Sequence, residues 1–216
     1  AYIDNVQLVE LSHEFEIQNG SFEDNTATPG GGWVGGGSYN ELGANPEQFS
    51  DVDTQGVTGW DSTTRIWLYR NQGGANEANF PVGDFAIGID ANFGHNGVDV
   101  LAHSDLYLLA DNLYELTFDL WGQGSATIEP LDVRITHTFT DALDPVGGTG
   151  TTLLGERTTV GNDSAYETVT VRFTPTVSAV YALQFFMDTT DNANSHAYID
   201  NVQITWFPRG TVISVR

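Results

Sequence analysis

Short runs in which apolar and polar residues alternate cover much of this 216-residue chain, and clusters of Gly, Asn, Asp and Pro separate them. Residues 114–121, for example, read YELTFDLW. Because successive side chains of a strand point to opposite faces, Leu116, Phe118 and Leu120 would share one face. The same pattern predicts strands at residues 14–18, 65–70, 85–89, 114–121, 131–138, 167–173, 180–186 and 196–206.

Helical periodicity is nearly absent from the chain. Only residues 105–116 could hold a helical turn, and the β-forming residues among them argue against it. Many short strands with turn residues between them are typical of two packed sheets. We therefore predict an all-β sandwich with long loops in its first half.

The two ends of the chain carry the same seven residues. Residues 1–7 and 197–203 both read AYIDNVQ, 196 positions apart. An offset close to the size of a domain is typical of a tandem array. Residues 1–8 would then be the closing strand of a preceding unit, or a copy of one. The alternative is that they are an excess segment.

Strand-like sequence at both ends suggests how copies of the chain could assemble. We divide the chain into an N-terminal strand extension (1–13), a sandwich domain (14–206) and a strand-like tail (207–216). Either end could pair with a sheet edge of another copy, which would build an open polymer. The alternative is that both ends pair within their own domain. The residues expected to carry self-assembly are Tyr2, Ile3, Asp4, Val6 and Leu8.

The composition of the chain excludes several classes of partner. It has 29 acidic residues and 7 basic ones, all Arg, for a net charge of −22. This charge repels phosphate backbones, and no apolar run is long enough to span a membrane, so we expect neither nucleic-acid binding nor membrane insertion. The absence of Cys excludes disulfides and thiolate metal sites. A chain that begins at Ala1 is expected to be either a processed chain or an excised piece of a longer one. The acidic, Lys-free composition suits a protein that is secreted or displayed at the cell surface.

Sequence motifs for catalysis are absent. The chain has no GxSxG, HExxH or phosphate-binding GxxxxGK motif, and its five His residues lack the spacing of metal ligands. Glu14 and Glu16 would share one face of a strand, but two carboxylates of one strand cannot flank a sugar bond from opposite sides. We therefore expect that the chain is not an enzyme.

Four short motifs fall in a recognisable order along the chain: NGSFE at 19–23, GW at 59–60, YELTFDLW at 114–121 and YIDNV at 198–202. In this order they resemble the jelly-roll carbohydrate-binding modules found beside xylanases and glucanases, and related galactose-binding-like domains of bacterial secreted and surface proteins. The resemblance covers residues 14–206. It implies a jelly-roll β-sandwich of two antiparallel sheets, with a structural calcium ion held near Glu23 and Asp200.

The residues around these two carboxylates suit calcium, which prefers roughly six to eight oxygen ligands. Asn25 follows Glu23 in a predicted turn, and Asp200 lies within an apolar strand, where a carboxylate without a partner is costly. We expect Glu23, Asp200 and Asn25 to hold Ca²⁺. The alternative is that Asp200 packs at a strand edge and Glu23 is solvated.

Exposed aromatic side chains could bind sugars, because the apolar face of a pyranose ring stacks on an aromatic ring. Trp33 and Tyr39 flank a Gly-rich loop. Trp67 and Tyr69 are two positions apart on a predicted strand, so they share a face, although that face could also be the core. These four residues form the candidate sugar site. Other aromatic candidates are Tyr166 and, with core packing expected instead, Trp60 and Trp121.

These observations suggest three functions, given in decreasing order of support from the sequence. The first is a non-catalytic, calcium-stabilised structural or adhesive subunit that assembles with copies of itself, by β-strand exchange, into an extracellular filament or surface array. The second is a carbohydrate-binding module that works beside a polysaccharide-degrading enzyme, with a polysaccharide as its partner. The third is an enzyme. The sequence identifies neither the sugar nor the number of calcium ions.

Overall fold

A computed structural model describes the chain at residues 17–27, 33–34, 47–49, 52–63, 66–70, 83–91, 98–124, 131–144, 147–157, 166–188 and 195–207. These residues are almost entirely β, as predicted, with one short 3-10 helix, η2 (Val52–Gln55). The strands are β1 (Trp33–Val34), β2 (Glu47–Phe49), β3 (Asp61–Ser62), β4 (Ile66–Arg70), β5 (Phe85–Ala91), β6 (Val98–Leu108), β7 (Leu113–Gly124), β8 (Leu131–His137), β9 (Thr149–Arg157), β10 (Glu167–Phe173), β11 (Ala179–Asp188) and β12 (Ser195–Phe207).

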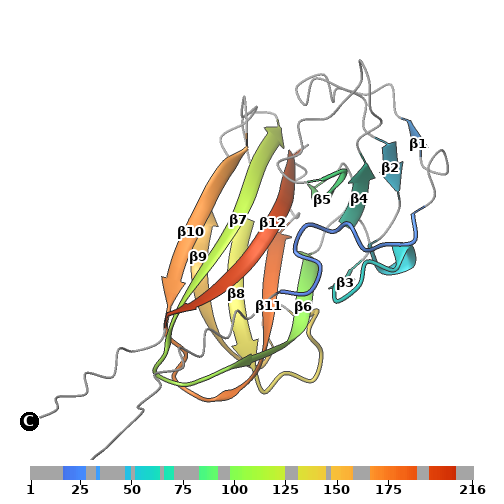
Figure 1. Ribbon diagram of the computed structural model, residues 1–216. Helices are drawn as coiled ribbons and strands as arrows, with labels where there is room; N and C mark the ends of the chain where they lie inside the picture. The colour runs from blue at the N-terminus through green and yellow to red at the C-terminus, as the bar shows by residue number, and fades with distance from the viewer. Residues whose placement is uncertain are drawn as a thin grey trace, which may run out of the picture.

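The strands form two antiparallel sheets that lie face to face (Figure 1). The seven-stranded sheet has the order β1-β2-β4-β5-β12-β7-β10, and the five-stranded sheet has the order β3-β6-β11-β8-β9. This arrangement is a jelly-roll β-sandwich, which confirms the predicted fold class. None of the described residues forms a helix that is both long and apolar enough to cross a membrane.

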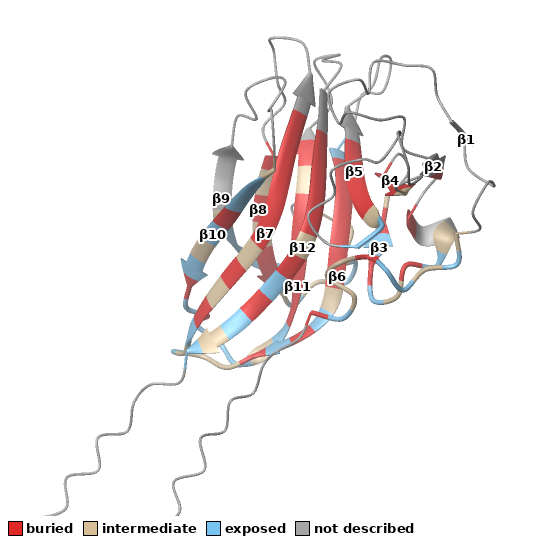
Figure 2. Ribbon diagram, turned by 45° about the horizontal axis from the view of Figure 1, so that its top comes forward, coloured by how far each residue is buried: buried red, intermediate tan, exposed pale blue. Residues whose placement is uncertain are grey.

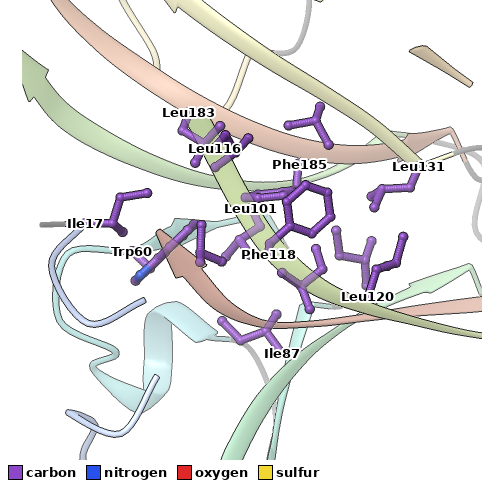
Figure 3. Packing of buried hydrophobic residues seen from close by; sticks show 14 of the residues in the cluster. Ile17, Trp60, Ile87, Leu101, Leu116, Phe118, Leu120, Leu131, Leu183 and Phe185 are labelled. Carbon is purple, nitrogen blue, oxygen red and sulfur yellow. The ribbon is translucent and has the colours of Figure 1, made fainter. Parts of the chain in front are cut away.

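The core lies between the two sheets and is built by the alternation of their strands. Leu116, Phe118 and Leu120 of β7 point inward, as predicted. They face Leu183 and Phe185 of β11, which belong to the other sheet (Figure 3). The rings of Phe118 and Phe185 lie edge to face with their centroids 5.1 Å apart. Buried residues continue along the central strands of both sheets (Figure 2).

Most of the predicted strands are present, and β10 has the predicted bounds. The strand predicted at residues 14–18 is wrong where it is described, because Ile17 lies outside any strand and Gln18 belongs to a turn. Ile17 is nevertheless buried in the core. Two long strands, β6 and β9, were not predicted. Polar residues interrupt the apolar pattern of β6, and β9 begins within a Gly- and Thr-rich stretch that resembles a loop.

The closing strand β12 lies in the middle of the seven-stranded sheet, where it pairs with β5 on one side and β7 on the other. This strand carries the second copy of the repeated heptad. All the described strands belong to one sandwich. The predicted N-terminal extension and C-terminal tail lie outside the described residues, so their boundaries remain predictions.

Candidate functional site

A second cluster of aromatic residues lies on the outer side of the seven-stranded sheet, away from the core between the sheets. Alternation along each strand sends these side chains outward, so that in β7 Leu120 faces the core and Trp121 faces out. The cluster, termed the aromatic face, consists of Tyr69, Trp121 and Tyr198, with Trp67 and Tyr166 packed against them.

Strand register aligns the aromatic face across the sheet. Trp67 of β4 and Tyr198 of β12 both pair with Gly88 of β5, which lies between them. On its other side, Tyr198 pairs with Trp121 of β7. Tyr166 immediately precedes β10, the next strand along. Because neighbouring strands lie about 4.8 Å apart, side chains aligned over these five strands span about 19 Å.

Gly88 allows the rings to meet across β5. A Cβ at this position would lie 2.5 Å from Tyr69 Cε2 and 3.1 Å from Tyr198 Cε1. The rings of Tyr69 and Tyr198 pack edge to face with centroids 5.0 Å apart. Trp121 continues the series, at 4.9 Å from Tyr198 and 6.4 Å from Tyr166. A continuous series of rings therefore crosses the middle of the sheet.

Two buried carboxylates lie on the same side of the sheet as the rings. Asp119 and Asp200 pair with each other across β7 and β12, and their exposed fractions are 6% and 0%. Asp119 Oδ1 accepts a hydrogen bond from Thr168 Oγ1 at 2.6 Å, and its Oδ2 accepts one from Asn201 Nδ2 at 3.1 Å. Asp200 Oδ1 accepts one from the Asn201 backbone N–H at 2.6 Å.

A β-bulge places Asn201 beside these carboxylates. The register of β12 shifts between Asp200 and Gln203, and Asn201 adopts a φ of 51° there. Asn tolerates this left-handed conformation better than most residues. Bulges of this kind re-aim side chains. Here the Asn201 side chain reaches Asp119 on the neighbouring strand.

Two polar atoms of the aromatic face are buried without a hydrogen-bond partner, namely Trp67 Nε1 and Tyr166 Oη. Burial raises the pKa of the Tyr166 hydroxyl well above its usual value, and the charges of Asp200 and Asp119 raise it further. The hydroxyl is therefore protonated at neutral pH and close to both carboxylates. Because an unpaired buried donor is costly, these two donors are suited to bonding groups of a ligand.

A shallow groove of about 350 Å³ lies away from the aromatic face and is lined by residues 56–61 and 104–105. Beside it, His103 is buried and neither ring nitrogen has a hydrogen-bond partner. Burial lowers the pKa of His103, while the charges of Asp105 and Asp61 act to raise it. In the described part of the chain, neither this groove nor any other place brings together three acidic or His side chains that could hold a metal.

The structure brings Trp67 and Tyr69 together on one face of β4, as predicted, in the smaller buried cluster and not in the main core between the sheets. Tyr69 is fully buried, whereas Trp67 is half-buried. Trp60 lies in the core, which confirms the expectation for that residue. Trp121 is buried, as expected, but its side chain lies in the smaller cluster on the outer side of the sheet and not in the main core between the sheets. Alternation with Leu116, Phe118 and Leu120 already places Trp121 on the opposite face of its strand.

Sequence reasoning did not select Tyr198 or Asp119 as site residues. The sequence signal that could have identified them is a spacing of two residues between an aromatic residue and an Asp. Tyr198 precedes Asp200 by two positions, and Asp119 precedes Trp121 by two. Each pair therefore shares one face of its strand. The two pairs lie on the same face of the sheet because β7 pairs with β12. The sequence did not reveal this pairing.

The three predicted calcium ligands are bonded to different parts of the chain. Glu23 Oε1 accepts hydrogen bonds from the backbone N–H groups of Asp84 and Phe85, both at 2.9 Å. Burial raises the pKa of Glu23, and these two hydrogen bonds act to lower it. Asn25 bonds within its own turn, and Asp200 lies on the side of the aromatic face. The described residues form no shared oxygen cage, and calcium binding remains a prediction from the resemblance.

The predicted self-assembly residues lie outside the described residues, as do Tyr39 and the side chain of Trp33. The predictions on those residues therefore stay untested. The predicted self-assembly residues are Tyr2, Ile3, Asp4, Val6 and Leu8. One described feature bears on strand exchange. Since β12 is paired on both sides, a second copy of its heptad could take the same place only by displacing β12.

The chain matches no family model and no curated protein sequence. Among solved structures, it is similar to the Stig cyclase Fisc from Fischerella sp. TAU in complex with an indole derivative (16% identity, 90% of this chain and 97% of that one, TM-score 0.56). It is also similar to an arabinose-bound α-L-arabinofuranosidase, MgGH51 (10% identity, 90% of this chain and 27% of that one, TM-score 0.53).

A carbohydrate-binding module structure is a further neighbour, in the CBM22-1–GH10 modules of xylanase 10B from Clostridium thermocellum complexed with xylohexaose (12% identity, 73% of this chain and 28% of that one, TM-score 0.47). At these identities the likenesses show the fold alone.

Proposed function

We propose that the chain is a secreted carbohydrate-binding module whose ligand site is the aromatic face. The observation that carries this proposal is a second cluster of five aromatic residues, separate from the main core between the sheets, in which two residues have buried polar atoms without partners. A cluster that served stability alone would be expected to satisfy its buried donors within the chain.

Sugar binding needs a flat apolar surface for the ring and polar groups for the hydroxyls. Trp67 and Tyr166 are both half-buried, so part of each ring can meet a ligand. Trp67 Nε1 and Tyr166 Oη are buried donors, so they would bond sugar oxygens after the atoms that cover them move aside. The fully buried rings that hold these two in place are Tyr69, Trp121 and Tyr198.

The extent of the aromatic face suits a polymer. A span of about 19 Å across the strands accommodates several linked sugar rings rather than one. The similar arabinofuranosidase has a stretch of this fold within a longer chain, which supports a role beside a polysaccharide-degrading enzyme. The cyclase likeness, at 16% identity, carries no chemistry to this chain, and the expectation that the chain is not an enzyme remains a prediction.

The test is the retention of the protein by soluble polysaccharides with different backbones (xylan, arabinan, mannan, chitosan and mixed-linkage β-glucan) in affinity electrophoresis. Calorimetry with oligosaccharides of the retained polymer would then compare Trp67→Ala and Tyr166→Ala with the parent. We expect each substitution to weaken binding at least about tenfold.

The matched control is Tyr107→Ala, which removes an aromatic ring from the outer side of the five-stranded sheet. Tyr107 is 51% exposed and pairs with Val180. Its loss should leave binding unchanged. Failure of every polysaccharide to retain the folded protein would contradict the proposal, as would equal weakening by all three substitutions.

A further inference from the structure

We propose that the aromatic face selects sugars that carry a protonated amine, such as β-1,4-linked glucosamine, over neutral sugars and over uronic acids. This inference rests on the proposed carbohydrate-binding function and names the class of its ligand. Three features support it: the place of two carboxylates, the neutral surroundings of one of them, and the rings beside both.

The carboxylates lie next to the rings. Asp119 and Asp200 are opposite each other in the pairing of β7 with β12, two positions from Trp121 and Tyr198 on the same strand faces. Tyr166, whose Oη is buried and unpartnered, directly precedes Glu167, and Glu167 and Thr168 pair with Leu120 and Asp119 of β7. A ligand at this hydroxyl would therefore lie beside the strands that carry both carboxylates.

The negative charge of Asp119 is not neutralised by a basic side chain among the described residues. Its carboxylate oxygens accept hydrogen bonds from two neutral groups, the Thr168 hydroxyl and the Asn201 amide. Arg172, further along β10, is engaged with Glu115, with Nε and Oε2 2.7 Å apart. A cation supplied by a ligand would meet a buried carboxylate held in place by neutral donors.

Rings and carboxylates together favour an ammonium group. Aromatic ring faces attract cations, and an ammonium donates charge-assisted hydrogen bonds to carboxylates. Both effects are stronger in a partly buried site than in water. A neutral sugar gains neither effect. A uronate would be repelled by Asp119 and Asp200 and by the net charge of −22.

The experiment compares three hexasaccharides by calorimetry at pH 5.5, where the amine is protonated: β-1,4-linked glucosamine, its N-acetylated counterpart and an oligogalacturonate. We expect the amine to bind at least about tenfold more tightly than the acetylated sugar, and the uronate not to bind. Asp119→Asn should reduce this preference to within about twofold, because it removes the charge and keeps the shape of the side chain.

The matched control is Asp132→Asn, the same change on β8 in the other sheet. Both substitutions alter the net charge equally, so only a local effect distinguishes them. Equal loss of preference in both variants would overturn the inference, as would tighter binding of the acetylated sugar or of any neutral polysaccharide. In the last two cases the proposed function stands. If none of the three hexasaccharides binds while a neutral polysaccharide retains the protein, the inference is wrong and the proposed function stands. If no polysaccharide retains the protein either, both proposals are wrong.

Discussion

The outer sides of the two sheets both bury polar side chains, but they differ in whether the donors have partners. On the five-stranded sheet an acceptor, Gln184 Oε1, has no partner, whereas the donors of Gln184 and Arg134 do. On this sheet, backbone carbonyl groups of residues 142, 144 and 147 accept hydrogen bonds from side chains of the strands. Gln184 Nε2 donates to the carbonyl oxygens of Ala142 and Asp144, at 2.7 and 3.0 Å. Arg134 Nη2 donates to the Gly147 carbonyl at 3.1 Å. On the seven-stranded sheet, Trp67 Nε1 and Tyr166 Oη have no such partner.

This difference suggests that the outer sides of the two sheets have different roles, one in stability and the other in ligand binding. Where the backbone of the same chain supplies the acceptors, buried donors contribute to stability and the surface is closed to other partners. On the side with the aligned rings, two buried donors make no hydrogen bond within the chain, so they can bond a ligand. We therefore expect substitutions on the first side to change stability alone, and those on the second to change ligand binding as well.

Trp121→Ala should have the largest effect, on both stability and ligand binding. A change in only one of these two properties would contradict the assigned roles of the two outer sides. Trp121 is fully buried and contacts the rings of Tyr198 and Tyr166. Truncation of a buried Trp costs about 3–5 kcal/mol. We expect a loss of this size in the free energy of unfolding, measured with urea, together with loss of polysaccharide retention. Full retention by the folded variant would show that the rings do not form the site.

Gln184→Ala should have a smaller effect, confined to stability. It removes two hydrogen bonds from a fully buried side chain to the half-buried carbonyl groups of Ala142 and Asp144, which costs about 1–3 kcal/mol. Urea denaturation would measure the loss, and affinity electrophoresis should show binding equal to that of the parent. A binding defect at temperatures where the variant is folded would contradict the separation of the two sides.

His103→Phe tests a pH effect that belongs to the core and not to either outer side. Because burial lowers the pKa of His103, the unfolded chain takes up a proton near pH 6.5 that the folded chain does not. Stability should therefore fall as the pH decreases below about 6.5, and the facing carboxylates Asp105 and Asp61 make the fall smaller. Phe can keep the edge contact with Trp60, whose ring centroid lies 5.2 Å away.

The measurement for His103→Phe is the unfolding free energy at pH 7.5 and at pH 5.5 for the parent and the variant. We expect a smaller difference between the two pH values in the variant. An unchanged difference would assign the acid effect to groups other than His103.

Tyr107→Ala should have the smallest effect. With half of its surface exposed and only Val180 opposite it, this ring is expected to change the free energy of unfolding by no more than about 0.5 kcal/mol. The same urea titration would detect a larger change. A larger change would show that the outer side of the five-stranded sheet also depends on its aromatic residues.

The sandwich could be predicted from the chain because alternation was strong in the strands that build it. In β7, for example, Leu116 and Phe118 mark the inward face. The shared face of Trp67 and Tyr69 followed from the same rule. β6 was missed because its inward residue His103 is polar, so the apolar pattern breaks in the middle of the strand.

The aromatic face could be predicted only in part. In β12, Ile199 and Tyr198 are both buried, one inward and one outward, so alternation does not identify the core side. Whether Tyr198 lies near Trp67 depends on strand register over a separation of more than a hundred residues. Pairing at that range is determined by the packing of the whole sheet, which no local pattern encodes.

The central position of β12 also has a consequence for synthesis of the protein. Ribosomes release the chain from its N-terminus, and domains fold as units once their parts are available. The strands β5 and β7 emerge well before the strand that separates them, so they must wait, or pair in another way, until residues 195–207 appear. The aromatic face is thus assembled in a single late event, and nascent chains stalled before that point should lack any affinity for a sugar.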